Sequence, residues 1–320
     1  WRCRCLAAPL LMWQTALLTS IMVLLPASLL LLVPLASARG AFLWVARQCQ
    51  AVWLGMAVAL VRHVLGVKIV LYAGAEVHDL AEQDILIISN HRTRVDWMFF
   101  WALAAALGRL GSLNIVLKDS LRSVPGFGWA TQCFGYAFMS RQGRSQDLRT
   151  LRRAAALHGG RGRLALLLFP EGTDLSENNR RRSSAFAEAH GLPEYTQILH
   201  PRAAGFVALS ESLRLVARAN GAAMPRLLDV TVGYVDYAPG ERPSEQSIFA
   251  RGRCCREVHV LIQPSATPAT AQEGEDVCRR LFAAKEPRLR QFYAPCAEGS
   301  PPPEPDPPPP RRGRALGFRG

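Results

Sequence analysis

The chain has 320 residues, of which 49% are hydrophobic, and this is enough for one sizeable α/β domain with additional segments. Its formal net charge of +13 at pH 7 favours an anionic partner, such as nucleic acid, an anionic membrane surface or a phosphorylated substrate. The sequence contains no zinc-finger spacing, RNP-like motif or basic helix with interleaved aromatic residues, which argues against nucleic acid.

The N-terminal region is strongly apolar. Residues 5–38 carry no charge, and about 20 apolar residues are enough to cross a bilayer. Pro26 and Pro34 are expected to kink this segment. A second uncharged run, 48–61, is compatible with a short span, a re-entrant piece or an interfacial helix. We predict a retained membrane anchor; the alternative is a signal peptide, because residues 36–38 resemble a cleavage site.

From residue 64 the sequence alternates between apolar runs of strand length and longer amphipathic segments, which is typical of an α/β domain. The predicted strands are 67–72, 85–88, 113–118, 135–141, 164–169, 230–234 and 258–262. The predicted helices begin near residues 97, 145, 206 and 270, the last one with an interruption at Pro287.

A histidine and an aspartate, His91 and Asp96, lie at the corner between the strand 85–88 and the next helix. Five residues along one helix turn a side chain by roughly 140°. The two side chains can therefore pair only if His91 lies in the loop and Asp96 in the first helical turn. Paired in this way, the carboxylate accepts the Nδ1 proton and leaves Nε2 as a base. The other interpretation is an ordinary loop histidine beside a capping aspartate.

Two further segments place polar groups at the ends of predicted strands. The strand 135–141 ends on Arg141, whose guanidinium fork suits a phosphate. The strand 164–169 runs into a glycine turn, FPEGT (169–173), with a carboxylate and a hydroxyl. Because ligands of open α/β sheets bind at the carboxyl ends of strands, we expect these segments to converge with His91. Each segment alone is also compatible with an ordinary solvated loop.

With these three segments, the sequence resembles the glycerophospholipid acyltransferases that carry an HX4D motif, over roughly residues 40–265. It is most similar to the lysocardiolipin acyltransferase branch, through five segments: NHRTRVDWMF (90–99), VPGFGWA (124–130), FPEGTDLSEN (169–178), SSAFAEAHGL (183–192) and LHPRAAGF (199–206). The resemblance implies an α/β fold with a mixed central sheet flanked by helices and with N-terminal membrane-embedded helices. Together with the apolar N-terminal runs and the Pro/Arg-rich composition after residue 295, it predicts three parts: an anchor (1–63), a catalytic domain (64–295) and a disordered Pro/Arg-rich tail (296–320).

The resemblance also assigns roles to particular residues. It implies a catalytic dyad, His91 and Asp96. It implies a set of acceptor-binding residues around the phosphate: Arg141, Glu171, Gly172 and Thr173. Many family members carry arginine where this chain has Asp174, so no phosphate contact is expected from that position.

The implied reaction moves a fatty acyl chain from acyl-CoA, a substrate, to a lysophospholipid. No cofactor or metal is expected, and the eight scattered cysteines have no metal-ligand spacing. His91 would deprotonate the acceptor hydroxyl, which attacks the thioester directly; an acyl-enzyme on Ser89 is the less favoured route. Cys133 could be a nucleophile by residue type, but buried packing is the expected role. The lipid bilayer is the expected partner, and the endoplasmic reticulum is the family expectation for localisation.

Three alternatives remain open in the sequence. The acceptor could be 1-acylglycerol-3-phosphate instead of lysocardiolipin or a related anionic lysophospholipid. The chain could also be a non-catalytic, lipid-binding membrane protein of the same fold. A hydrolase is disfavoured because the sequence lacks a G-x-S-x-G elbow.

Overall fold

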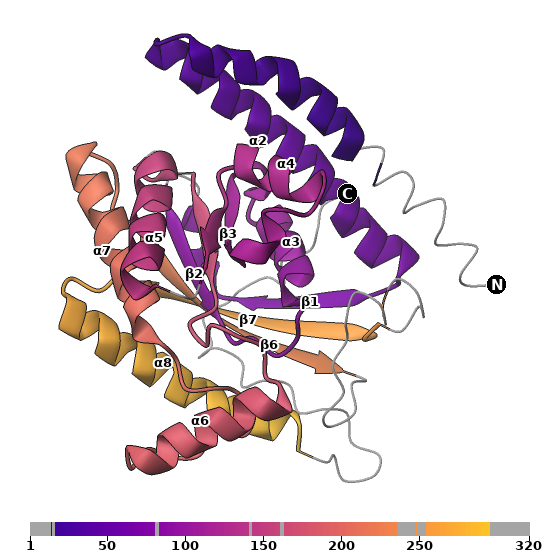
Figure 1. Ribbon diagram of the computed structural model, residues 1–320. Helices are drawn as coiled ribbons and strands as arrows, with labels where there is room; N and C mark the ends of the chain where they lie inside the picture. Colours follow the sequence, from indigo (N-terminus) through magenta and orange to yellow (C-terminus); the bar gives the residue numbers. More distant parts are fainter. Residues whose placement is uncertain are drawn as a thin grey trace.

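A seven-stranded sheet, in the order β1-β7-β6-β2-β5-β3-β4, forms the centre of the protein (Figure 1). The structure is a computed structural model that describes residues 14, 17–80, 83–140, 143–160, 163–235, 248 and 254–294. Its strands are β1 (Lys68–Ala73), β2 (Ile85–Ser89), β3 (Leu113–Lys118), β4 (Ala137–Met139), β5 (Ala165–Leu168), β6 (Arg226–Val235) and β7 (Glu257–Ala266). The pair β6–β7 is antiparallel, whereas the other pairs are parallel. The predicted mixed α/β sheet is therefore confirmed.

Helices cover both faces of the sheet (Figure 1). They are α2 (Ala36–Ala59), α3 (Asp96–Ala106), α4 (Phe127–Cys133), α5 (Arg144–His158), α6 (Glu177–Ala189), α7 (Ala203–Ala219) and α8 (Ala271–Phe292). Successive side chains of a strand point to opposite faces. In β2, Ile85 and Ile87 join the core cluster that contains α2 and α3, whereas Leu86 and Ile88 join the cluster of α5, α7 and α8. Burial on both faces explains the uninterrupted apolar run.

Several predicted elements have other bounds in the structure; β6 and β7, for example, are longer than the strands predicted over 230–234 and 258–262. The strand expected over 135–141 is shorter, because β4 covers only Ala137–Met139. The expected interruption at Pro287 is wrong: α8 continues through this residue. A proline removes one helical hydrogen bond. Buried side chains on both sides of it, Glu286 and Leu289, hold the two halves of the helix against the domain.

The described part of the apolar N-terminal region, from residue 17 on, folds into helices on the side of the sheet that α3 and α4 cover (Figure 1). Of the described helices, one is long and apolar enough to cross a membrane: Ser37–Val64, with a mean hydropathy of 1.2 in its most apolar window. A shorter apolar helix, Leu17–Leu32, precedes it. Large apolar side chains are exposed along this region: Leu18, Met22, Val23, Leu25, Leu29, Leu31, Leu32, Val33, Leu35, Trp44 and Val52.

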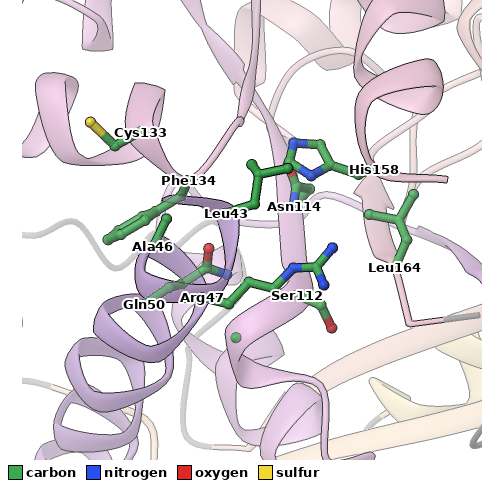
Figure 2. Close-up of a pocket in the computed structure, with 11 residues that line it drawn as sticks. Leu43, Ala46, Arg47, Gln50, Ser112, Asn114, Cys133, Phe134, His158 and Leu164 are labelled. Carbon is green, nitrogen blue, oxygen red and sulfur yellow. The ribbon is translucent and has the colours of Figure 1, made fainter. Parts of the chain in front are cut away.

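Gln50 connects the long apolar helix α2 to the sheet. Its amide Nε2 donates hydrogen bonds to the carbonyl oxygens of Leu110, over 2.9 Å, and Leu113, over 2.6 Å, where β3 begins. Gly111 permits this close approach, because a Cβ atom there would lie 2.6 Å from the carbonyl oxygen of Arg47. Figure 2 shows Gln50 and Arg47 beside a cavity of about 10 Å³, which is comparable to the space of one water molecule. The apolar helix is thus attached to the domain by specific polar contacts as well as by apolar packing.

Candidate active site

The strand register brings two loops together at the carboxyl edge of the sheet. Ile88 of β2 is paired with Leu168 of the parallel strand β5. The residues three positions beyond each of them, His91 and Glu171, are consequently neighbours. The backbone N–H of His91 donates to Oε1 of Glu171 over 2.8 Å. This is the edge at which α/β sheets bind ligands.

The structure places His91 in the loop after β2 and makes Asp96 the first residue of α3. Nδ1 of His91 lies 3.0 Å from Oδ2 of Asp96. The imidazole also stacks on Phe169, with 4.3 Å between ring centroids, which further restricts its orientation. The side chain of His91 remains 16% exposed, whereas that of Asp96 is buried at 1%.

The Asp96 carboxylate accepts several hydrogen bonds besides that of His91. The backbone N–H of Thr93 lies 3.1 Å from each oxygen, and the Thr93 hydroxyl donates to Oδ1 over 2.6 Å. The hydroxyl of Tyr234, in β6, donates to the same oxygen over 2.6 Å. A carboxylate can only accept hydrogen bonds. His91 therefore donates from Nδ1, and its Nε2 is left as an acceptor.

The Tyr234 contact was not expected from the sequence. Residues 96 and 234 are 138 positions apart, and the tyrosine reaches the dyad because β6 pairs with β2. Burial, reinforced by the charge of Asp96, raises the pKa of Tyr234 well above its ordinary value. The phenol therefore stays protonated and available as a donor.

Glu171 lies behind the glycine turn. Its second oxygen, Oε2, accepts from the backbone N–H of Leu199 over 2.9 Å, and only 2% of the residue is exposed. Both carboxylate oxygens are therefore occupied by backbone donors from different loops. In this position Glu171 holds the His91 loop against the 195–200 segment, a role distinct from the acceptor contact that the resemblance implies.

Gly172 and Thr173 line a cavity together with His91. Gly172 adopts a φ of +73°, a left-handed conformation that favours glycine and turns the chain at this point. The hydroxyl of Thr173 accepts a hydrogen bond from Nδ2 of Asn179 over 2.9 Å and lies 3.3 Å from Oδ1 of Asp174. Arg141, the remaining acceptor residue of the sequence prediction, lies outside the described residues.

The cavity has a volume of about 1310 Å³, larger than the roughly 300–1,000 Å³ typical of small-molecule pockets. Part of its wall is apolar and includes Trp97, Leu117 and Phe127. Polar and charged side chains also line it, among them Thr173 and Arg202.

The two other nucleophiles considered in the sequence are poorly placed for catalysis. Burial raises the pKa of Cys133 to about 11, which keeps its thiol protonated and weakly nucleophilic. Ser89 is fully buried at the end of β2, with its hydroxyl 3.4 Å from Oδ1 of Asn90. The described geometry thus favours His91 as the reactive group of this edge.

Comparison with known proteins shows a similarity to acyltransferases. Residues 71–225 match the family model described as Acyltransferase. The lysocardiolipin acyltransferase 1 proteins of Mus musculus and Danio rerio are 37% and 38% identical to the chain, over 78% of its length in both cases. The "Probable 1-acyl-sn-glycerol-3-phosphate acyltransferase 5" of Arabidopsis thaliana is 33% identical over 70% of the chain. The chain is therefore similar to these acyltransferases over most of its length.

The chain spans 64%, 62% and 57% of the lengths of these three relatives. The crystal structure of the 1-acyl-sn-glycerophosphate acyltransferase from Thermotoga maritima gives a TM-score of 0.46 at 15% identity, covering 88% of this chain and 99% of that one.

The hydroxyl of Tyr234 should contribute measurably to stability. We expect Tyr234→Phe to lower the free energy of unfolding by about 1.5–3 kcal/mol, because it removes a hydrogen bond to a buried carboxylate. Denaturant titration of the detergent-solubilised protein measures this change. Tyr136→Phe is the control, since its buried hydroxyl has no hydrogen-bond partner among the described residues. Equal losses in both variants would contradict the role given to the Tyr234–Asp96 bond.

Glu171 should make stability depend on pH. Its burial raises its pKa well above the ordinary 4.5, and the N–H groups of His91 and Leu199 offset this only in part. The folded protein therefore holds this proton more tightly than the unfolded chain does. Its stabilising contribution is complete below pH 4.5 and is lost as the pH rises toward the raised pKa.

Comparison of wild type with Glu171→Gln, which cannot titrate, isolates this contribution. The difference in unfolding free energy, wild type minus variant, should become smaller as the pH rises from 4.5 to neutrality. Thermal or denaturant unfolding at a series of pH values gives the difference. A difference that grows with pH would show that the native carboxyl group has a lowered pKa.

Proposed function

We propose that this protein is a membrane-bound acyltransferase that moves a fatty acyl chain from acyl-CoA to the free hydroxyl of a lysophospholipid. The observation that carries the proposal is a histidine on the wall of a large, partly apolar cavity, with its Nδ1 held by a buried aspartate. The match to the acyltransferase family model and the similarity to named acyltransferases support the reaction class. The acceptor favoured by the names of the relatives is lysocardiolipin or a related anionic lysophospholipid.

In the proposed reaction, Nε2 of His91 takes the proton of the acceptor hydroxyl while the oxygen attacks the carbonyl carbon of the thioester. A C–O bond forms, the C–S bond breaks, and the coenzyme A thiolate receives the proton from the imidazolium. Asp96 keeps Nε2 unprotonated before the reaction and compensates the positive ring charge during it. The four donor groups around Asp96, including Tyr234, keep the carboxylate in place through both states.

The N-terminal helices would hold the enzyme on its substrate. Both the lysophospholipid and the product carry acyl chains that stay in the bilayer. Exposed apolar side chains on Leu17–Leu32 and the length of Ser37–Val64 support insertion into a membrane. The high net positive charge would favour anionic lipid head groups. We place the protein in the endoplasmic reticulum membrane on the family expectation.

A second acceptor follows from another relative. The Arabidopsis protein of 33% identity is named as a probable 1-acyl-sn-glycerol-3-phosphate acyltransferase. Its substrate shares with lysocardiolipin a phosphate, a free hydroxyl and an acyl chain. Both molecules are chemically suited to the same cavity, so an acceptor panel must include both.

Acyl transfer from labelled oleoyl-CoA to this panel tests the proposal, with membranes carrying wild type or His91→Ala. The variant should lose about 10²–10⁴-fold in rate, the usual contribution of a positioned base. His190→Ala, an exposed histidine after α6, is the control and should retain activity. Wild-type protein that is folded and membrane-bound but transfers to no acceptor would support the non-catalytic, lipid-binding alternative. Full activity in His91→Ala would contradict the assigned base.

A further inference from the structure

Four cationic side chains line the cavity: Arg94, Lys118, Arg202 and Arg279. Arg279 is paired, because its Nη2 lies 3.1 Å from Oε2 of Glu275, another cavity residue. Within the described part of the chain, no carboxylate lies within ion-pair distance of Arg202. Its guanidinium can therefore bind an anionic ligand without first breaking an ion pair.

The position of Arg202 distinguishes it from Arg94 and Lys118, which likewise have no ion-pair partner among the residues that the structure describes. Its backbone N–H donates to the carbonyl oxygen of Pro170 over 2.8 Å, so the residue is fixed to the turn that follows β5. Its side chain extends over the same turn: a Cβ atom added to Gly172 would lie 3.7 Å from Cδ of Arg202. Helix α7 begins at the next residue, Ala203, so the backbone of Arg202 is also fixed on its C-terminal side.

Phosphate binding at this turn requires a cation from another segment, because the turn itself carries a negative charge. Position 174 carries a carboxylate, Asp174, that lines the cavity and accepts a hydrogen bond from Asn179 at its backbone oxygen over 3.0 Å. A carboxylate at this position repels a phosphate instead of binding it. Arg202 approaches the turn from a separate segment of the chain and supplies positive charge beside Gly172 and Thr173.

We propose that Arg202 binds a phosphate group of a substrate at the Gly172–Thr173 turn and so provides the positive charge that position 174 lacks. The assignment rests on the proposed acyl transfer, since it names the substrate group that this side of the cavity recognises. A guanidinium binds two phosphate oxygens at once through its planar fork. The phosphate can come from the acceptor head group or from coenzyme A. His91, Gly172 and Thr173 line the same cavity. This favours the acceptor as the source of the phosphate, because the acceptor hydroxyl must reach His91.

Two pairs of substrates separate these sources. Lysophosphatidic acid and monooleoylglycerol differ by the acceptor phosphate. Oleoyl-CoA and oleoyl-pantetheine differ by the 3′-phospho-ADP part of the donor, which carries all of its phosphates. Wild type and Arg202→Gln are compared as full-length protein in lipid nanodiscs. We expect the variant to weaken binding and raise KM for lysophosphatidic acid by about 10- to 100-fold, with monooleoylglycerol unchanged. Loss of discrimination only between the two donors would assign the same contact to coenzyme A.

Two control variants make the test decisive. Arg279→Gln removes a cavity arginine that is already paired, and it should leave both discriminations intact. Arg202→Lys keeps the charge without the fork and should restore part of the lost affinity. Unchanged discrimination in Arg202→Gln for both substrate pairs would overturn the proposal.

Direct binding is measured alongside turnover, so that the two proposals can fail separately. Phosphate-selective binding that depends on Arg202, without any transfer by wild type, would refute the enzymatic function but support the binding site. Transfer by wild type with undiminished phosphate selectivity in Arg202→Gln would refute only the site.

Discussion

The arrangement of the site depends on one buried carboxylate. Asp96 begins α3, is 1% exposed and receives hydrogen bonds from His91, Thr93 and Tyr234. Burial without partners would make such a charge very costly, so every donor around it is part of its stability. The same donors fix the direction of Oδ2 and, through it, the orientation of the imidazole. Stability and catalytic geometry are therefore provided by the same set of contacts.

Helix α8 and the residue that follows it contact the loops and the strand that form this site. The Tyr293 hydroxyl accepts from the backbone N–H of Tyr234, and its ring lies 3.8 Å from the Arg92 guanidinium. Glu286 accepts from the backbone N–H groups of Thr196 and Gln197, next to the segment that binds Glu171. The neighbouring Lys285 is fully buried and bonded to Asp229 of β6. Removing one partner of such a buried pair costs about 3–5 kcal/mol, because the other charge then stays buried without compensation.

Sequence reasoning succeeded where the information was local. The strand–loop–helix corner follows from the apolar runs around residues 85–103, and the five-residue spacing defines the only way in which His91 and Asp96 can meet. It failed where contacts between distant segments of the chain determine which residues reach the site. Tyr234 and Arg202 reach the site through strand order and through the start of α7, which no local pattern records. The helix through Pro287 is a similar case, because packing on both sides of the proline outweighs the lost hydrogen bond.

The central claim is that Asp96 holds the neutral imidazole of His91 with its proton on Nδ1 and with Nε2 free to act as a base. Nitrogen NMR of the protein labelled with ¹⁵N-histidine tests this claim directly, with the His91→Gln variant to assign the signal. The account predicts a protonated Nδ1 and an unprotonated Nε2 in the neutral ring. A proton on Nε2 would contradict it, because the nitrogen proposed to accept the substrate proton would already carry one.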